Sequence, residues 1–531
     1  MTADSAAPPA AAVWGEAIVV VERHGVPYRM YAERPRRVEQ LLAFANRWGS
    51  RSHVIQGGHE LSFADLRLAV AAKAAALADA GLPPQQHVLI LGWNSPEWII
   101  NFWACMQICA VPVLANAWWS EAEVAAALDL VRPALVLADE HGAAKVPAAW
   151  RRGPWETDPA AWRRRPSGTA PQPPDSDEEQ PAAVIFTSGT SGRPKAVVLS
   201  HRSLLAGLHM LLHVSRRLPQ QIDETSGDTG LHTGPLFHIG GIQTLLRAIT
   251  VGGTLVMPAG RFDPGEALML IERYRISRWS AVPTMVSRLL EHPDVQTRDL
   301  RSLRSVTVGG APVHAELLER IRTGLPGADA RVPTGYGLTE NGGQATAASG
   351  RDTAERPGSS GRPLPCVELR FLAGPGLPDG EILVRSPTQM SGYLGSGESP
   401  IDNEGWLHTG DLGHLDVAGH LWITGRSKDL IIRGGENIAP AAVERALAGI
   451  RGVADAAVIG VPHADLGEEV MAFVVTADDA LTPAGLAQAL RGTVASFAVP
   501  SRWHLQREPL PTNHTHKVDK QALRALIQAG M

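Results

Sequence analysis

Short apolar runs alternate with longer amphipathic stretches over the first part of the chain. The apolar runs have the length of buried strands, and the periodic stretches have the length of helices. Strands are expected at 87–91, 110–114 and 134–138, and helices at 63–80, 96–108 and 121–131. Ser95 followed by Pro96 fits a helix start, because serine caps free amides and proline is tolerated at the first helical position. The alternation predicts a parallel, doubly wound α/β unit.

A second set of the same kind follows. It comprises a helix from Ser203, strands at 254–257, 279–281 and 305–309, and helices at 264–274 and 283–290. Two such halves are expected to stack into one large domain. The segment 150–181 is rich in proline and acidic residues, and we interpret it as a surface linker between the two halves.

The pattern changes again near Val367. Short strands separated by turns, at 367–371, 380–384 and 421–424, predict a small β subdomain. After Lys428 comes a compact α+β tail, with strands at 430–432, 453–460 and 470–475 and helices at 440–448, 482–490 and from Asp519. The tail has the size of a small independent domain.

Composition narrows the class of protein. The chain has 531 residues, of which 44% are hydrophobic and 19% are charged, so there is ample material for packed cores. Lys and Arg number 49 against 54 Asp and Glu, a formal charge of -5 that argues against a nucleic-acid partner. Three cysteines cannot form a disulfide framework, and Cys105 and Cys109 lack the partners of a zinc site.

Neither a membrane span nor a signal peptide is expected. The uncharged stretch 98–119 is the best candidate for a span, but Pro112 would break a helix there. The first residues are rich in Ala and Pro and carry no basic region before an apolar one. We therefore expect a cytoplasmic protein.

The run from Thr187 to Lys195 carries the most chemistry. It reads Thr-Ser-Gly-Thr-Ser-Gly-Arg-Pro-Lys and follows an apolar strand. Its glycines let backbone N–H groups point into one concavity, and its hydroxyls and lysine add donors and a positive charge, as a polyphosphate requires. Pro194 before the lysine distinguishes it from a Walker A loop. Taken alone, the run fits a phosphate-binding loop and a plain Ser/Gly turn equally well.

Further motifs follow the loop in a fixed order. They are Pro235-Leu236-Phe237-His238, Gly309-Gly310-Ala311-Pro312, Gly335-Tyr336-Gly337-Leu338-Thr339-Glu340, Trp406-Leu407-His408-Thr409-Gly410-Asp411, Gly425-Arg426-Ser427-Lys428-Asp429 and Gly434-Gly435-Glu436-Asn437-Ile438-Ala439-Pro440. With the loop, they resemble the signatures of the adenylate-forming superfamily, which includes acyl-CoA synthetases, luciferases and nonribosomal adenylation domains. The resemblance covers about 184–524, and its last motif is similar to that of the CoA ligases. Ala196 stands where the family usually has a glycine.

The resemblance implies a fold and a reaction. The fold is a large N-terminal domain, 1–425, made of two stacked α/β subdomains and a small β subdomain, followed by a small mobile α+β domain, 426–531, that swivels near Lys428. The reaction joins a carboxylic acid to CoA through an acyl-adenylate, with ATP and Mg²⁺ as cofactors and AMP as a product. The acid itself cannot be inferred, and a homodimer is left open.

The resemblance also assigns the site residues. The implied nucleotide- and CoA-binding residues are Thr187, Ser188, Gly189, Thr190, Ser191, Gly192, Lys195, Gly310, Ala311, Tyr336, Gly337, Asp411, Arg426, Lys428, Gly434, Gly435 and Glu436. The implied catalytic residues are Lys517, His238, Thr339 and Glu340, with Glu340 also the Mg²⁺ ligand.

Physical chemistry supports several of these roles. The ring of Tyr336 offers a face for adenine, the carboxylate of Asp411 can accept from two ribose hydroxyls, and Glu340 is a hard oxygen ligand. Each also has a structural explanation: a core tyrosine, a turn cap and a solvated glutamate. His238 beside Phe237 is equally consistent with a core histidine.

The C-terminal end departs from the family pattern. The family brings a catalytic lysine on a loop with a preceding glycine, whereas here the run is Pro511-Thr512-Asn513-His514-Thr515-His516-Lys517. His516 tolerates the positive φ of that glycine poorly. This departure leaves open an enzyme that forms thioesters from a pre-made acyl-adenylate. The same motifs also permit a ligase that loads the phosphopantetheine of a carrier protein. The third alternative is an inactive nucleotide-binding protein, against which the presence of Lys195, Glu340, Asp411 and Lys517 argues.

Overall fold

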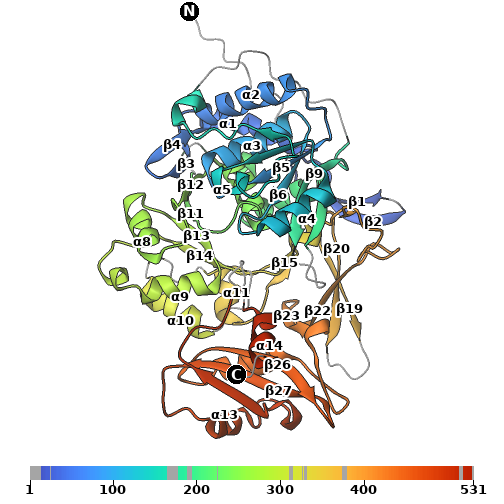
Figure 1. Ribbon diagram of the computed structural model, residues 1–531, viewed down its shortest axis with the longest axis vertical. Helices are drawn as coiled ribbons and strands as arrows, with labels where there is room; N and C mark the ends of the chain where they lie inside the picture. The colour runs from blue at the N-terminus through green and yellow to red at the C-terminus, as the bar shows by residue number, and fades with distance from the viewer. Residues whose placement is uncertain are drawn as a thin grey trace, which may run out of the picture.

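The computed structural model describes most of the chain. The described residues are 14–23, 25–163, 177–187, 194–223, 225, 227–309, 315–325, 327, 332–373, 379–512 and 518–528. They form a large domain with two mainly parallel sheets, a four-stranded β subdomain and a small C-terminal domain (Figure 1). Within them, no helix is long and apolar enough to cross a membrane.

The first sheet has seven strands in the order β21-β10-β9-β6-β5-β7-β8. The five strands from β9 to β8 are parallel to one another. β10 runs antiparallel to β9, and the edge strand β21 runs antiparallel to β10. The strands are β5 (His87–Leu91), β6 (Val111–Ala115), β7 (Leu135–Ala138), β8 (Arg152–Gly153), β9 (Pro181–Thr187), β10 (Lys195–Ser200) and β21 (Gly392–Tyr393). The helices that connect its first strands are α3 (Pro96–Gln107), α4 (Glu121–Val131) and α5 (Glu140–Ala143). As predicted, Ser95 caps α3 by accepting from the amide of Trp98.

The second sheet has six strands in the order β14-β13-β11-β12-β3-β4, all parallel except β4. The strands are β3 (Ser52–Gln56), β4 (His59–Ser62), β11 (Thr229–His232), β12 (Thr254–Met257), β13 (Arg278–Ala281) and β14 (Ser305–Val308). The associated helices are α1 (Phe44–Trp48), α2 (Phe63–Asp79), α6 (His201–Val214), α7 (Ile239–Val251), α8 (Pro264–Arg273), α9 (Pro283–Glu291) and α10 (Ala315–Gly324). The largest apolar core joins α2, α3, α6 and α7 to strands of both sheets, so the two subdomains share one interior.

The interpretation of 150–181 as a linker between two halves is wrong. β8 lies inside this segment, and β9 and β10, which follow it, return to the first sheet. The second sheet in turn takes β3 and β4 from before the first sheet. Proline and acidic residues indicate exposure, but they do not determine which sheet the next strand joins, because strand pairing is set by distant partners.

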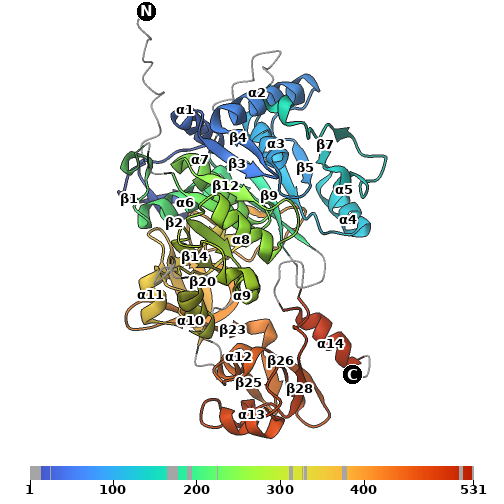
Figure 2. The ribbon, with the colours of Figure 1, turned by 90° about the vertical axis from the view of Figure 1, so that its left-hand side faces the viewer.

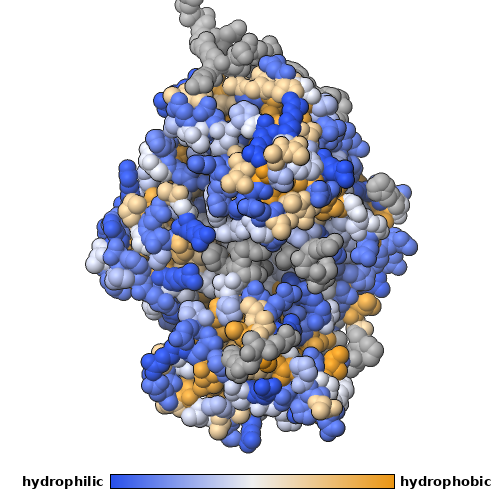
Figure 3. Space-filling view, viewed as in Figure 1, coloured by the Kyte–Doolittle hydropathy of each residue, from blue (hydrophilic) through white to orange (hydrophobic). Residues whose placement is uncertain are grey.

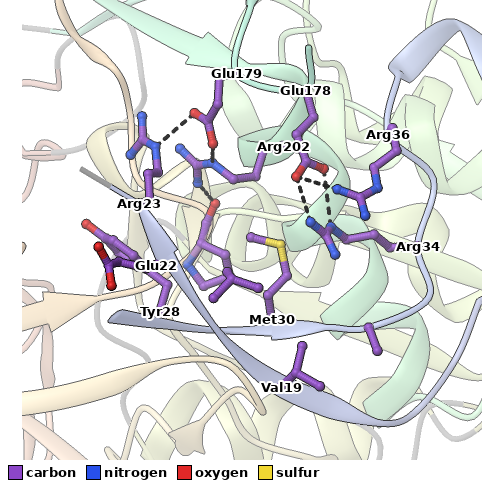
Figure 4. Close-up of a pocket in the computed structure, with 13 residues that line it drawn as sticks. Val19, Glu22, Arg23, Tyr28, Met30, Arg34, Arg36, Glu178, Glu179 and Arg202 are labelled. Atoms are coloured by element: carbon purple, nitrogen blue, oxygen red, sulfur yellow. Dashed lines mark hydrogen bonds and ion pairs between the residues drawn. The ribbon is translucent and has the colours of Figure 1, made fainter. Parts of the chain in front are cut away.

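The acidic end of this segment is an ion-pair centre. Glu178 pairs with Arg34 at 2.6 Å and Arg36 at 2.8 Å, and Glu179 pairs with Arg202 at 2.7 Å. These pairs line a cavity of about 490 Å³ beneath the hairpin of β1 (Ile18–Arg23) and β2 (Val26–Tyr31), as Figure 4 shows. Glu179 also pairs with Arg23 of β1 at 2.9 Å, so these ion pairs fasten the hairpin to the large domain.

The predicted β subdomain is a four-stranded antiparallel sheet in the order β19-β20-β22-β23. Its strands are β19 (Glu368–Ala373), β20 (Gly380–Arg385), β22 (Leu407–Leu415) and β23 (Leu421–Arg426). Shorter elements precede it: β15 (Gly337–Leu338), the 3-10 turn η6 (Thr339–Asn341), β16 (Gly343–Gln344), β17 (Thr346–Ala347), α11 (Gly350–Glu355) and β18 (Arg362–Pro363).

The small domain is an α+β unit, as predicted. Its sheet runs β25-β24-β27-β26, with β28 parallel to β27. Its elements are β24 (Ile431–Arg433), β25 (Glu436–Ile438), α12 (Pro440–Ala448), β26 (Val453–His463), β27 (Gly467–Thr476), α13 (Pro483–Leu490), β28 (Arg502–Gln506) and α14 (Lys520–Gln528). Both ribbon views place α14 on the side of this domain that faces the large domain (Figures 1 and 2). One direct contact is the hydrogen bond from Arg445 to the carbonyl of Ile423, at 3.2 Å.

Candidate active site

Two residues of the predicted phosphate loop lie opposite each other in the first sheet. Thr187 ends β9 and Lys195 begins β10, and the two are paired in the antiparallel register. The residues between them that the sequence singles out, Ser188, Gly189, Thr190, Ser191 and Gly192, lie outside the described residues. The hairpin therefore presents one hydroxyl and one ammonium at the two ends of the predicted loop.

Glu340 lies beside this hairpin. Its backbone carbonyl accepts from the amide of Met390 at 2.9 Å, which fixes η6 against the chain that leads into β21. Its Oε1 accepts from the hydroxyl of Tyr393 at 3.1 Å and from that of Thr187 at 3.4 Å. The structure thus brings together Thr187 and Glu340, which are 153 positions apart in the chain.

Tyr393 is a site residue that the sequence reasoning missed. It lies in β21, pairs with Val197 of β10, and carries the ammonium of Lys195 4.6 Å from the centre of its ring. Burial raises the pKa of its phenol, and the neighbouring carboxylate of Glu340 raises it further, so the hydroxyl stays a donor at neutral pH. A two-residue strand gives almost no periodic signal, and only its pairing with β10 shows what Tyr393 contacts.

A second polar cluster surrounds Asp411 in β22. Oδ2 accepts from the hydroxyl of Tyr336 at 2.6 Å, and Oδ1 accepts from Nε of Arg426 at 2.7 Å. Asp411 is 5% exposed and Tyr336 8%. Burial, and then the charge of Asp411, raise the pKa of Tyr336 well above its usual value. Each carboxylate oxygen accepts more than one hydrogen bond, so Asp411 keeps capacity for further donors.

The burial of Tyr336 modifies the sequence expectation. The residue packs in the core of the β subdomain together with Leu407, and its hydroxyl is fixed on Asp411, so only a small part of the ring is open to a ligand. The neighbouring Gly337 has a packing reason: a Cβ there would lie 2.3 Å from the carbonyl oxygen of Gly343. Thr339 opens η6 and accepts from the amide of Gly342.

His238 begins helix α7 as its N-cap residue and packs against the ring of Phe237 at 4.7 Å. The loop before it is held by Asn94, a second residue that the sequence reasoning missed. Asn94 accepts from the amide of Leu236 at 2.8 Å and donates to the carbonyl of Gly234 at 2.7 Å. Because Asn94 follows β5 and the loop follows β11, this contact ties the carboxyl ends of the two sheets together, where open α/β sheets bind ligands.

The remaining described candidates lie in the small domain and at its start. Gly434 and Gly435 form the exposed turn between β24 and β25, with φ of 58° and 86°, values that favour glycine in a two-residue hairpin turn. Glu436 begins β25 and is exposed. Lys428 is exposed in the 3-10 turn that follows β23. Gly310, Ala311 and Lys517 lie outside the described residues.

The donor set fits a magnesium nucleotide. Among the described residues, no group of three or more His, Cys, Asp or Glu side chains could hold a metal by itself. Mg²⁺ commonly takes one or two carboxylates together with phosphates and water, and Glu340 supplies one such carboxylate beside a hydroxyl and an ammonium. Asp411 and Arg426 add an acceptor and a donor on the β subdomain.

The chain is similar to known ligases in sequence and in structure. The chain is 36% identical, over 87% of its length and 93% of the relative, to a "3-[(3aS,4S,7aS)-7a-methyl-1,5-dioxo-octahydro-1H-inden-4-yl]propanoyl:CoA ligase" of Mycobacterium tuberculosis. It is 35% identical to a fatty acid–[acyl-carrier-protein] ligase of Streptomyces coeruleorubidus, over 89% of this chain and 92% of the relative. The structure of an O-succinylbenzoate CoA synthetase of Bacillus subtilis with ATP and magnesium matches with a TM-score of 0.74 and 29% identity, covering 91% of this chain and 98% of that one.

The two domains match family descriptions separately. Residues 41–394 match "AMP-binding enzyme", and residues 442–517 match "AMP-binding enzyme C-terminal domain". The first match alone covers more than half of the chain. The chain therefore belongs to the AMP-binding enzyme family, in its acyl-CoA synthetase branch.

Proposed function

We propose that this chain is an AMP-forming acid–thiol ligase that activates a carboxylic acid with ATP and transfers the acyl group to CoA. The observation that carries the proposal is a set of contacts. Glu340 accepts from the hydroxyls of Thr187 and Tyr393, and the ammonium of Lys195 lies over the ring of Tyr393. A carboxylate, a hydroxyl and an ammonium at the ends of a phosphate-type loop suit a magnesium-bound polyphosphate. The CoA ligase among the relatives supports the same activity.

In the first step, a carboxylate oxygen of the acid attacks the α-phosphorus of ATP, and the bond to pyrophosphate breaks. Lys195 and Thr187 would bind the phosphates, and Asp411 would accept from the ribose hydroxyls. Mg²⁺, when bound at Glu340, supplies charge neutralisation for the departing pyrophosphate. Lys517 would neutralise charge at the α-phosphate. Positioning and charge stabilisation account for most of the rate in such a reaction.

In the second step, the CoA thiol gives up its proton to solvent and its sulfur attacks the acyl carbonyl carbon, and AMP leaves with the bonding electrons. We propose that the boundary at 425 and 426 divides two rigid units and that Lys428 is the pivot between them. Its exposed 3-10 turn directly follows β23, and the turn at Gly434 and Gly435 lies at the surface of the moving unit. Rotation would replace the Lys517 loop at the site with this turn.

The thiol acceptor is the finer part of the proposal. One relative is a CoA ligase at 36% identity and another loads an acyl carrier protein at 35%, so identity does not separate the two acceptors. The sequence Gly434-Gly435-Glu436-Asn437 resembles the CoA-ligase form of this loop, and we therefore propose free CoA.

Mass spectrometry of products from a panel of carboxylic acids tests the function. Wild-type protein is incubated with each acid, ATP and Mg²⁺, and either CoA or a phosphopantetheinylated carrier protein. The expected products are AMP, pyrophosphate and one acyl-CoA. Acylation of the carrier protein without acyl-CoA would replace the acceptor, and the absence of acid-dependent pyrophosphate release across the panel would overturn the adenylating function.

A further inference from the structure

Tyr393 makes a different contact through each part of its side chain. The hydroxyl donates to Oε1 of Glu340 at 3.1 Å, and the ring carries the ammonium of Lys195 at 4.6 Å from its centre. The residue is held by the ladder between β21 and β10 and by the flanking hydrogen bonds from Ser391 to Val198 and from Leu394 to Ala196. Tyr393 is therefore fixed between a carboxylate and an ammonium.

Glu340 and Lys195 carry opposite charges and both contact the side chain of Tyr393, so they would attract each other without a spacer. A lysine has a long flexible stem, and an ion pair with Glu340 would occupy the two groups that the proposed site needs for phosphate and metal. An aromatic face attracts the ammonium without neutralising the carboxylate, and a phenolic hydrogen bond orients the carboxylate without cancelling its charge. The same side chain can thus hold both groups ready.

We propose that Tyr393 is a positioning residue that keeps Glu340 and Lys195 apart and aims each at the magnesium nucleotide. The proposal rests on the proposed function of this site. The hydroxyl orients Glu340 as a partner of a metal ligand does, and the ring directs Lys195 toward the phosphates. The two contributions are separable by substitution.

Three variants separate them. Tyr393→Phe keeps the ring beneath Lys195 and removes the hydrogen bond to Glu340, whereas Tyr393→Leu removes both. Tyr274→Phe is the matched control, because Tyr274 also lies beneath a cation, Arg273 at 5.1 Å, but packs among the side chains of the second sheet and its helices. Thermal unfolding of each variant establishes that it is folded.

The measurement is calorimetric titration of each protein with ATP, without acid substrate, at increasing Mg²⁺ and separately in EDTA. In Tyr393→Phe, the Mg²⁺ concentration that gives half of the full Mg²⁺-dependent gain in ATP affinity should rise about tenfold, as expected for a lost hydrogen bond to a charged group. The affinity for ATP in EDTA should be unchanged. Tyr393→Leu should also weaken ATP binding in EDTA, by about threefold or more, because Lys195 is no longer directed at the phosphates.

The outcomes separate this inference from the proposed function. An unchanged Mg²⁺ dependence in a folded Tyr393→Phe protein would overturn the role of the hydroxyl. Equal behaviour of Tyr393→Phe and Tyr393→Leu in EDTA would overturn the role of the ring. An effect of the same size in Tyr274→Phe would show that the loss is not specific to the site. A wild-type protein that binds no ATP with Mg²⁺ would instead contradict the proposed function itself.

Discussion

The two domains hold their proposed site residues in contrasting ways. In the large domain Asp411 is 5% exposed and Tyr336 8%, and each side chain is fixed by a short hydrogen bond. In the small domain the turn at Gly434 and Gly435 is exposed, and so is Lys428 in the connection between the domains. The side chains proposed to bind the nucleotide are therefore preorganised, whereas the groups proposed to alternate over them are exposed.

This difference corresponds to the two demands of a two-step ligation. Charge stabilisation requires groups that need no rearrangement when the reaction occurs. Presenting two different surfaces to one site requires a connection that can change its backbone angles. If the contrast is correct, substitutions in the large domain should affect both steps through nucleotide binding, and substitutions in the small domain should affect one step at a time.

The largest effect is expected for Lys517→Ala. Acyl-adenylate formation should fall by about 100-fold or more, because an ammonium that stabilises charge at the α-phosphate is lost. Thioester formation from a supplied acyl-adenylate should continue at the wild-type rate. Lys520→Ala is the matched control, since Lys520 pairs with Glu444 at 2.7 Å in the same C-terminal segment. Pyrophosphate release and acyl-CoA formation are measured separately, and an unaffected first step would remove Lys517 from the mechanism.

Asp411→Ala should weaken AMP and ATP binding by roughly 5- to 100-fold, because the ribose hydroxyls lose an acceptor and Tyr336 and Arg426 lose a shared partner. The control is Asp416→Asn, in the turn between β22 and β23, where Asp416 accepts from the indole of Trp422 at 3.2 Å. Equilibrium dialysis with AMP gives the affinity. Wild-type affinity in folded Asp411→Ala protein would contradict the assignment.

Lys428→Pro should slow one half-reaction by about tenfold or more and spare the other. Proline fixes φ near −65°, so a pivot residue would be held in one of its two states. Lys428→Ala removes the same side chain without this restriction, so it should not favour one half-reaction over the other. The two half-reactions are assayed separately in both variants, and wild-type rates for both in Lys428→Pro would place the pivot elsewhere.

Acid should destabilise the large domain preferentially. Burial lowers the pKa of His53, His209 and His232 to about 4, and all three lie in the large domain. No described histidine of the small domain is buried. The unfolded chain binds these protons near pH 6.5. The contribution of the neutral histidines to the free energy of unfolding is therefore fully present above pH 6.5 and is lost as the pH falls toward 4.

Each of these histidines should lower the free energy of unfolding by roughly 2 kcal/mol at pH 5 relative to pH 7.5. Tryptophan fluorescence during urea unfolding reports the large domain, since Trp503 is the only tryptophan after residue 425. The variant His232→Leu removes one of the three titrating groups and should lose less stability on acidification. A pH-independent midpoint in wild type would contradict this prediction.

The local pattern of the sequence predicted most elements. The helices at 121–131 and 440–448 and the strands at 87–91 and 254–257 have the predicted bounds. Helix caps and the 3.6-residue period depend on residues that are close together in the chain, so they can be identified from the sequence alone. β1, β3, β10 and β28 were not predicted, and the segment 150–181 was wrongly interpreted as a linker between the two halves. Those features depend on distant strand partners.

The site shows the same division. Motifs identified Thr187, Lys195 and Glu340 as candidates, and the structure brings Thr187 and Glu340 into contact. Tyr393 and Asn94 could not be identified, because their importance comes from contacts across 53 and 142 positions of the chain. The ring of Tyr336 was expected to be a binding face, and its 8% exposure reflects packing that only the folded β subdomain creates.

The most direct test of the two-step account is a single-turnover experiment with wild-type protein and an accepted acid. Enzyme in excess over ATP, with Mg²⁺ present, is mixed with the acid. Pyrophosphate is followed before and after addition of CoA. The account predicts acid-dependent pyrophosphate release without CoA, followed by acyl-CoA and AMP in equal amounts once CoA is added. Absence of the first phase, together with acyl-CoA formation from a supplied acyl-adenylate, would contradict it and assign the chain to the thioester step alone.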